Sequence, residues 1–212
     1  MKRILMIAFA LCAICAGAAA QETWFCGEAG TRLSYVKKDA KGAAEGAGYS
    51  YIIKEKKVAD GRTTITFDVE IPGQKGAAGC SVWSADGLYH TDASAAIGQF
   101  GEGVEAKGNA PVLPENPQLG AALADCAISI DAMMITSEYK KIKFTANEDV
   151  TVAAGTFNCW CLEYDIVDKV MGLKADNHVQ QWIAKGIGDV KVVTKDRRGR
   201  VVSEKELVKI SK

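Results

Sequence analysis

The sequence predicts a mostly β protein in which a single curved antiparallel sheet forms a half-barrel or open barrel, with one or two short helices. The first observation is a period of two, clearest where Ile65, Phe67 and Val69 alternate with polar residues, as in a half-buried strand. The second is the repeated placement of Asp and Gly between such segments, because these residues tolerate the positive φ angles of hairpin turns. About eight to eleven strands are expected, and a sheet of that size tends to curl.

The expected strands follow one another along the chain with a turn after each. Asp60-Gly61 separates Tyr49–Val58 from the strand that contains Ile65, and Asp86-Gly87 follows Cys80–Ser84. Because short turns join these segments, they are expected to be antiparallel neighbours and not βαβ units. The remaining expected strands are Thr31–Lys38, Leu88–Asp92, Val150–Ala153, Phe157–Val167, Val190–Lys195 and Arg200–Glu204.

Two regions interrupt the strand pattern. Ala93–Asn116 is rich in Gly, Ala and Pro and is predicted to hold a short helix near Ala93–Gln99 followed by a loop. Lys174–Gln181 is polar and is predicted to be another loop or short turn. By contrast, Phe157–Val167 is apolar on both faces, which suits a curled sheet that encloses something. A sandwich whose second sheet covers the first is the alternative.

Residues 1–20 are predicted to be a cleaved secretory signal peptide. Lys2 and Arg3 form a positive n-region, Ile4–Leu11 forms an apolar h-region, and Ala18–Ala20 supplies a small-residue cleavage site. Residues 21–212 are then expected to form one antiparallel β domain in the periplasm of a bacterial cell envelope. Lipid attachment to a cysteine of the leader, or a retained anchor, is the alternative.

The predicted mature chain is almost neutral. Without Lys2 and Arg3, its 26 acidic residues exceed the remaining 24 basic residues by two, and the charges are scattered. A nucleic-acid partner would need clustered Lys and Arg, so none is expected. No second apolar run approaches membrane-spanning length, so no transmembrane segment is expected after cleavage. The oligomeric state stays open.

Five cysteines remain after cleavage, and an exported compartment permits disulfides between them. An odd number leaves at least one free thiol in a monomer. Cys159 and Cys161 would lie about 6.6 Å apart on one strand face, too far for comfortable disulfide geometry. The pairing therefore stays open among Cys26, Cys80, Cys126, Cys159 and Cys161.

Three segments carry a family resemblance. Val152–Cys159 resembles a V-P-A-G-T-F-x-C hairpin, and Trp182–Gly188 resembles a W-Y-A-x-G-V-G segment. Pro117–Gly120 loosely resembles the start of a P-x-L-x-x-G-x-x-L-x-D motif. Together they resemble the TapB-like family of exported bacterial proteins of unknown function, over roughly residues 27–210. Ala153 stands where that family favours proline.

This resemblance implies a curved antiparallel sheet similar to that of the bacterial lipoprotein-localisation factors, which hold acyl chains on the concave face. It implies no catalytic residues. The glycines of the shared segments are expected to adopt backbone angles that other residues resist. The residues assigned this structural role are Gly155, Thr156, Phe157, Gly186 and Gly188.

No catalytic or metal motif is recognised. His90 and His178 are the two histidines, and Cys159-Trp160-Cys161 matches zinc and redox motifs poorly. Glu163 and Asp165 are expected to be neighbours on one strand face and not a carboxylate pair across a cleft. The sequence therefore predicts no enzyme and no cofactor or metal. A hydrolase or redox enzyme, with a histidine near a carboxylate or cysteine, is a third hypothesis.

The leading functional hypothesis is an envelope protein that binds an apolar or amphipathic ligand, such as a lipid or lipopeptide, on the concave face. The alternative is an envelope interaction or structural protein with a filled core. Large apolar side chains serve a ligand pocket and a core equally well. The residues predicted to line a ligand are Tyr49, Tyr51, Phe67, Met134, Trp160 and Trp182.

Overall fold

In the computed structural model, which describes residues 23–46, 48–97 and 105–212, thirteen strands form one antiparallel sheet. The predicted leader and its boundary at residue 20 lie outside these residues. Within them, no helix is long and apolar enough to cross a membrane. The strands are β1 (Arg32–Asp39), β2 (Tyr49–Ala59), β3 (Arg62–Glu70), β4 (Cys80–Ala85), β5 (Leu88–Thr91), β6 (Lys107–Gly108), β7 (Leu113–Pro114), β8 (Cys126–Ile130), β9 (Ile135–Val152), β10 (Gly155–Val170), β11 (Leu173–Ala184), β12 (Gly188–Asp196) and β13 (Val201–Ser211).

The strand order is β6-β8-β9-β10-β11-β12-β13-β1-β2-β3-β4-β5-β7. The one long-range step is the pairing of β1 with β13, in which Arg32 lies opposite Ser211. The edge strands β6 and β7 are separated by residues 109–112 alone, a connection that spans at most about 18 Å. The two edges therefore lie close together without pairing, and the predicted curved antiparallel sheet is confirmed over a sandwich.

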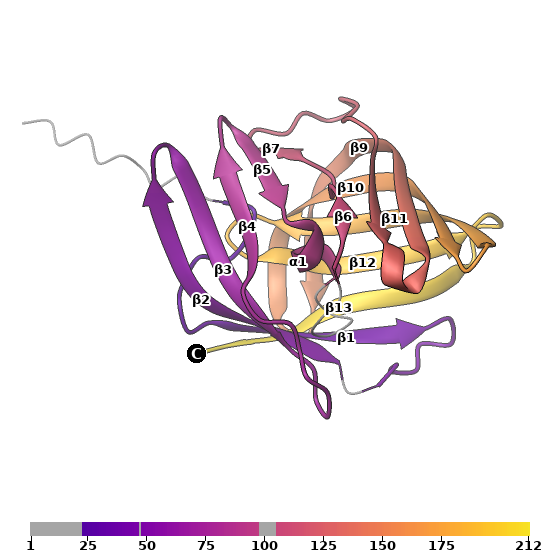
Figure 1. The fold of residues 1–212 in the computed structure, drawn as a ribbon, viewed down its shortest axis with the longest axis horizontal. Helices are drawn as coiled ribbons and strands as arrows, with labels where there is room; N and C mark the ends of the chain where they lie inside the picture. Colours follow the sequence, from indigo (N-terminus) through magenta and orange to yellow (C-terminus); the bar gives the residue numbers. More distant parts are fainter. Residues whose placement is uncertain (1–22, 47, 98–104) are drawn as a thin grey trace, which may run out of the picture.

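Figure 1 shows the sheet bending so that β2–β4 and β9–β12 stand on opposite sides of the short helix α1 (Ala93–Ile97). A 3-10 helix, η2 (Asp131–Met133), joins β8 to β9. The prediction of a helix near Ala93–Gln99 is confirmed for residues 93–97, and residues 98–99 lie outside the described part.

The predicted Asp-Gly turns adopt the expected geometry. Asp60 and Gly61 have φ angles of 50° and 73°, and Asp86 and Gly87 have φ angles of 51° and 75°. The prediction of a loop at Lys174–Gln181 is wrong, because these residues belong to β11. Every second side chain from Lys174 to Gln180 is polar and lies on the outer face of a central strand, and His178 bonds to Asp165 of the neighbouring β10. The polar residues of this segment therefore belong to a paired strand with a solvent-facing side and not to a loop.

The main core lies inside the curve of the sheet and takes in the segment that precedes β1. Trp24 stacks on Phe144 of β9 with ring centroids 5.7 Å apart, and its indole Nε1 donates to the Pro114 carbonyl at 3.0 Å. Gly188 has a φ of 103°, and an added Cβ would lie 2.8 Å from the Phe25 ring. The glycine therefore allows the N-terminal segment to pack against β12.

The five described cysteines are all free thiols, in place of the disulfides considered from the sequence. Cys159 and Cys161 share β10, whereas Cys80 lies on β4, Cys126 on β8 and Cys26 in the segment before β1. Burial raises the pKa of Cys80 and Cys126 to about 11 and that of Cys159 to about 12. These three thiols are therefore weak nucleophiles at neutral pH.

Candidate ligand-binding cavity

A cavity of about 550 Å³ lies on the concave face of the sheet. Strands β2, β3, β5 and β10–β13 contribute its walls. Ala95 and Ala96 of α1, Ala110 and Pro111 of the connection between the edge strands, and Leu113 of β7 also line it. The segment that brings the open edges together therefore helps to enclose the space.

One wall of the cavity is aromatic. Tyr49 and Tyr51 are two residues apart on β2, so their side chains point to the same face of the sheet. Phe67 of β3 lies on that face as well. The ring centroids of Tyr51 and Phe67 lie 5.1 Å apart, and those of Phe25 and Phe67 lie 4.9 Å apart. These contacts make a continuous apolar surface.

Beside the aromatic wall, the cavity is lined by four polar side chains, one from each of β10–β13, which we call the inner polar group: Tyr164, Gln181, Asp189 and Lys205. The Lys205 ammonium lies 2.5 Å from Asp189 Oδ2. Gln181 Nε2 donates to Asp189 Oδ1 at 2.7 Å, and the Tyr164 hydroxyl donates to Gln181 Oε1 at 3.2 Å. The chain of contacts crosses four neighbouring strands and fixes each side chain.

The charges in the cavity wall are balanced. Desolvation, the largest single influence, would lower the pKa of Lys205, but Asp189 and Tyr51 together outweigh it and raise that pKa, so the ammonium stays protonated. Among the described residues, the wall has two further charged side chains, Lys37 and Glu45, whose charged atoms lie 2.9 Å apart. The described part of the wall therefore carries no unpaired charge.

Tyr49 is the exception to this satisfied network. Its side chain is 9% exposed, and its hydroxyl makes no hydrogen bond of good geometry to a described residue, although an interaction with the Tyr51 hydroxyl lowers its pKa slightly. Burial and the Asp189 carboxylate raise the pKa of Tyr49, so its hydroxyl stays neutral. A buried hydroxyl without a hydrogen bond of good geometry costs free energy, and a polar group of a bound molecule would supply that bond if the side chain turned toward it.

Three of the six residues predicted to line a ligand lie in the cavity wall, namely Tyr49, Tyr51 and Phe67. The other three lie outside it. Met134 is 62% exposed, in the left-handed turn after η2. Trp160 packs edge-on against Phe144, and the Trp182 indole donates to Glu148 Oε1 at 2.7 Å on the outer side of β11.

The inner polar group was not predicted from the sequence. One signal was present, because Lys205 stands two residues before Leu207 and so shares a strand face with a fully buried leucine. A charged residue on a buried strand face is uncommon unless it is paired. The partner Asp189 lies on another strand, so only the fold brings the two together.

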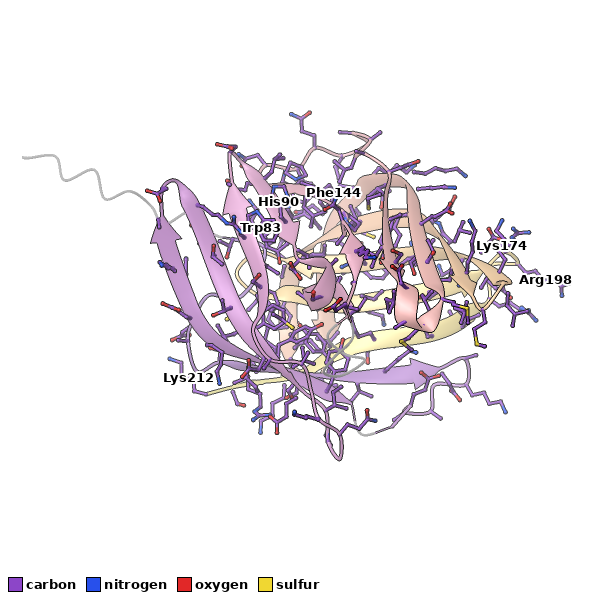
Figure 2. All side chains as sticks on the ribbon, in the orientation of Figure 1. Trp83, His90, Phe144, Lys174, Arg198 and Lys212 are labelled. Atoms are coloured by element: carbon purple, nitrogen blue, oxygen red, sulfur yellow. The ribbon has the colours of Figure 1, made fainter. Side chains whose placement is uncertain are left out.

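Neither histidine lies in the cavity wall. His178 alternates with Val179 and Gln181, so it points away from the cavity, and its Nδ1 lies 3.1 Å from Asp165 Oδ1. Figure 2 shows His90 beside Trp83, and their stacked rings have centroids 5.2 Å apart. No group of three or more metal-ligating residues occurs in the described ranges. A histidine does lie near a carboxylate, but outside the cavity.

A family model described as DUF3108-like matches residues 28–207. Two solved structures are similar in fold. A candidate exported protein with a YmcC-like fold from Bacteroides fragilis has 14% identity and a TM-score of 0.74, covering 90% of this chain and 100% of its own. A candidate lipoprotein from Parabacteroides distasonis has 17% identity and a TM-score of 0.69, covering 90% and 99%. None of the curated proteins matches the chain.

Proposed function

This chain belongs to the DUF3108-like family, and we propose that it is a non-enzymatic protein that binds an apolar or amphipathic small molecule in the cavity of its sheet. The observation that carries the proposal is the cavity of about 550 Å³, which falls within the range of ~300–1,000 Å³ typical of ligand sites. Its aromatic wall suits a lipid or lipopeptide chain. Each CH₂ group that leaves water for this wall would contribute about 0.8 kcal/mol to binding.

We place this activity in the bacterial cell envelope, with the periplasm as the compartment. The leader predicted at residues 1–20 supports export, as do the descriptions of the two structural neighbours as an exported protein and a lipoprotein. The TapB-like motifs are consistent with this placement. The resemblance to the lipoprotein-localisation factors stays an analogy of fold, and folds host many functions.

The alternative, an interaction protein with a filled core, is not favoured. A filled core would leave no space of ligand size inside the curve of the sheet. It would also give the Tyr49 hydroxyl a partner or replace it with an apolar group, because unsatisfied buried polar groups are uncommon.

The first experiment is native mass spectrometry of the purified mature protein, followed by titration with the uncharged fluorescent probe N-phenylnaphthylamine. A co-purifying small molecule, or saturable probe binding, is expected. The variant Thr194→Trp places a large side chain in the cavity wall, and it should weaken probe binding at least about tenfold.

The matched control is Thr66→Trp, on the face of β3 opposite Phe67, which should leave probe binding unchanged. A protein that carries no small molecule and never binds the probe would contradict the proposal. Equal loss of binding in both variants would also contradict it, because the site would then lie outside the cavity.

A further inference from the structure

The charges of the cavity wall indicate the chemical class of the ligand. This inference rests on the proposed function. We infer that the polar end of the ligand is an uncharged hydrogen-bonding group, such as the hydroxyl, ester or amide of a neutral lipid. The monoacylglycerols are the simplest members of this class. The apolar chain would lie along the aromatic wall, and the polar end would meet the Tyr49 hydroxyl.

An anionic head group finds no free cation among the described residues that line the cavity. Of the two lysines in the wall, Lys37 is paired with Glu45, and Lys205 with Asp189. A carboxylate or phosphate bound at Lys205 would have to displace Asp189 or lie beside it. Two anions would then share one ammonium in a partly dehydrated site, and such a site opposes a second charge of the same sign.

A cationic head group is also disfavoured, because the carboxylate that it would need, Asp189, is already paired. Asp189 already accepts from Lys205 and, through its other oxygen, from Gln181. A bound ammonium would therefore compete with two existing donors. Its charge would also lose hydration on entering the cavity, and no unpaired charge of the wall replaces that hydration.

An uncharged head group, by contrast, can give the buried Tyr49 hydroxyl the hydrogen bond of good geometry that it lacks among the described residues. The Tyr49 hydroxyl can donate to an ester or amide carbonyl and can accept from a ligand hydroxyl. The ring next to it, Tyr51, continues to Phe67 and Phe25, so an apolar chain attached to that head group meets aromatic surface at once. The polar end of such a ligand would therefore lie at Tyr49, and its apolar chain would extend from there toward Phe67.

The test compares three ligands with the same twelve-carbon chain: glycerol monolaurate, laurate and dodecyltrimethylammonium. Displacement of N-phenylnaphthylamine from the mature protein is measured below the micelle concentration of each ligand. Glycerol monolaurate is expected to bind at least about tenfold more tightly than either charged ligand. Laurate or the ammonium binding as tightly as glycerol monolaurate overturns the inference and leaves the proposed cavity intact, whereas no binding by the probe or any ligand overturns both.

Two variants separate the contributions. Asp189→Asn frees Lys205 from its carboxylate, so the preference should shift toward laurate by at least about tenfold, while the outer-face control Asp165→Asn should keep the original preference. An unchanged preference in Asp189→Asn overturns the inference.

Tyr49→Phe removes only the Tyr49 hydroxyl, and it should weaken the affinity for glycerol monolaurate about fivefold to tenfold without lowering Tm. Full retention of glycerol monolaurate affinity in Tyr49→Phe also overturns it.

Discussion

Each face of the sheet carries a group of paired polar side chains. The ion pairs of the two groups have similar distances, but their side chains differ in how far they are buried. The inner polar group joins Lys205 to Asp189 at 2.5 Å, with side chains 20% and 22% exposed. An outer polar group, formed by Lys141, Asp165 and His178, joins Lys141 to Asp165 at 2.8 Å, with side chains 81% and 37% exposed. Distance alone therefore does not rank these ion pairs. Water weakens the outer pair, and the inner pair has far less water to replace either partner.

The largest effect is expected from Lys205→Met, which breaks the inner polar group. Asp189 would remain with the Gln181 amide as its one side-chain hydrogen-bond donor, and removing one partner of a buried pair costs about 3–5 kcal/mol. We expect the lower end of this range, because the cavity admits water. Urea unfolding of the mature protein measures the loss, and a destabilisation below about 1 kcal/mol would show that the two faces are energetically alike.

An intermediate effect is expected from Gly188→Ala, which disturbs the inner face beside Asp189. The residue would be strained at its φ of 103°, and its Cβ would press on the Phe25 ring, so a loss of roughly 1–3 kcal/mol is expected. Gly199→Ala is the matched control, since its φ is 77° but nothing lies within 4 Å of the added Cβ. Thermal unfolding compares them, and equal losses in both variants would assign the whole effect to backbone strain.

The smallest effect is expected from Asp165→Asn in the outer polar group. Hydrogen bonds from Lys141 and His178 lower the pKa of Asp165, so its ionised form stabilises the fold. Because the carboxyl is 37% exposed, a loss of only about 0.2–1 kcal/mol is expected at pH 7.

The same pKa shift predicts how this small contribution depends on pH. A lowered folded-state pKa gives stability that is fully present above the unfolded value of about 3.9 and is lost as the pH falls through the folded value. The difference between wild type and Asp165→Asn should therefore vanish in acid. A difference that grows on acidification from pH 5 to pH 2 would reverse the assigned sign.

Much of the fold could be predicted because its signals are local. The alternation around Ile65 and the Asp-Gly turns after residues 59 and 85 correspond to strands and turns of the structure. The candidate site was predicted in part, since Tyr49, Tyr51 and Phe67 line the cavity. Trp160 and Trp182 could not be placed, because an apolar side chain on a strand covered on both faces has two possible directions.

The polar side of the site depended on contacts distant in sequence. Lys205 and Asp189 are 16 residues apart, and the register of neighbouring strands brings them within reach. The polar stretch of β11 was also mispredicted for this reason, because its side-chain donors and acceptors bond to residues of β10 and β12. Neither pattern has a local signature that separates it from a solvated loop.

By itself, the sequence determined the β class, the positions of most turns and the presence of a large aromatic surface, since each depends on residues near one another in the chain. Only the tertiary structure decided that β1 pairs with β13, that the open edges stay close, and that a cavity of about 550 Å³ remains inside. The physical reason is that strand order and internal volume depend on how distant strands curve and pack. Local periodicity specifies which face of a strand is apolar, and it leaves open what that face encloses.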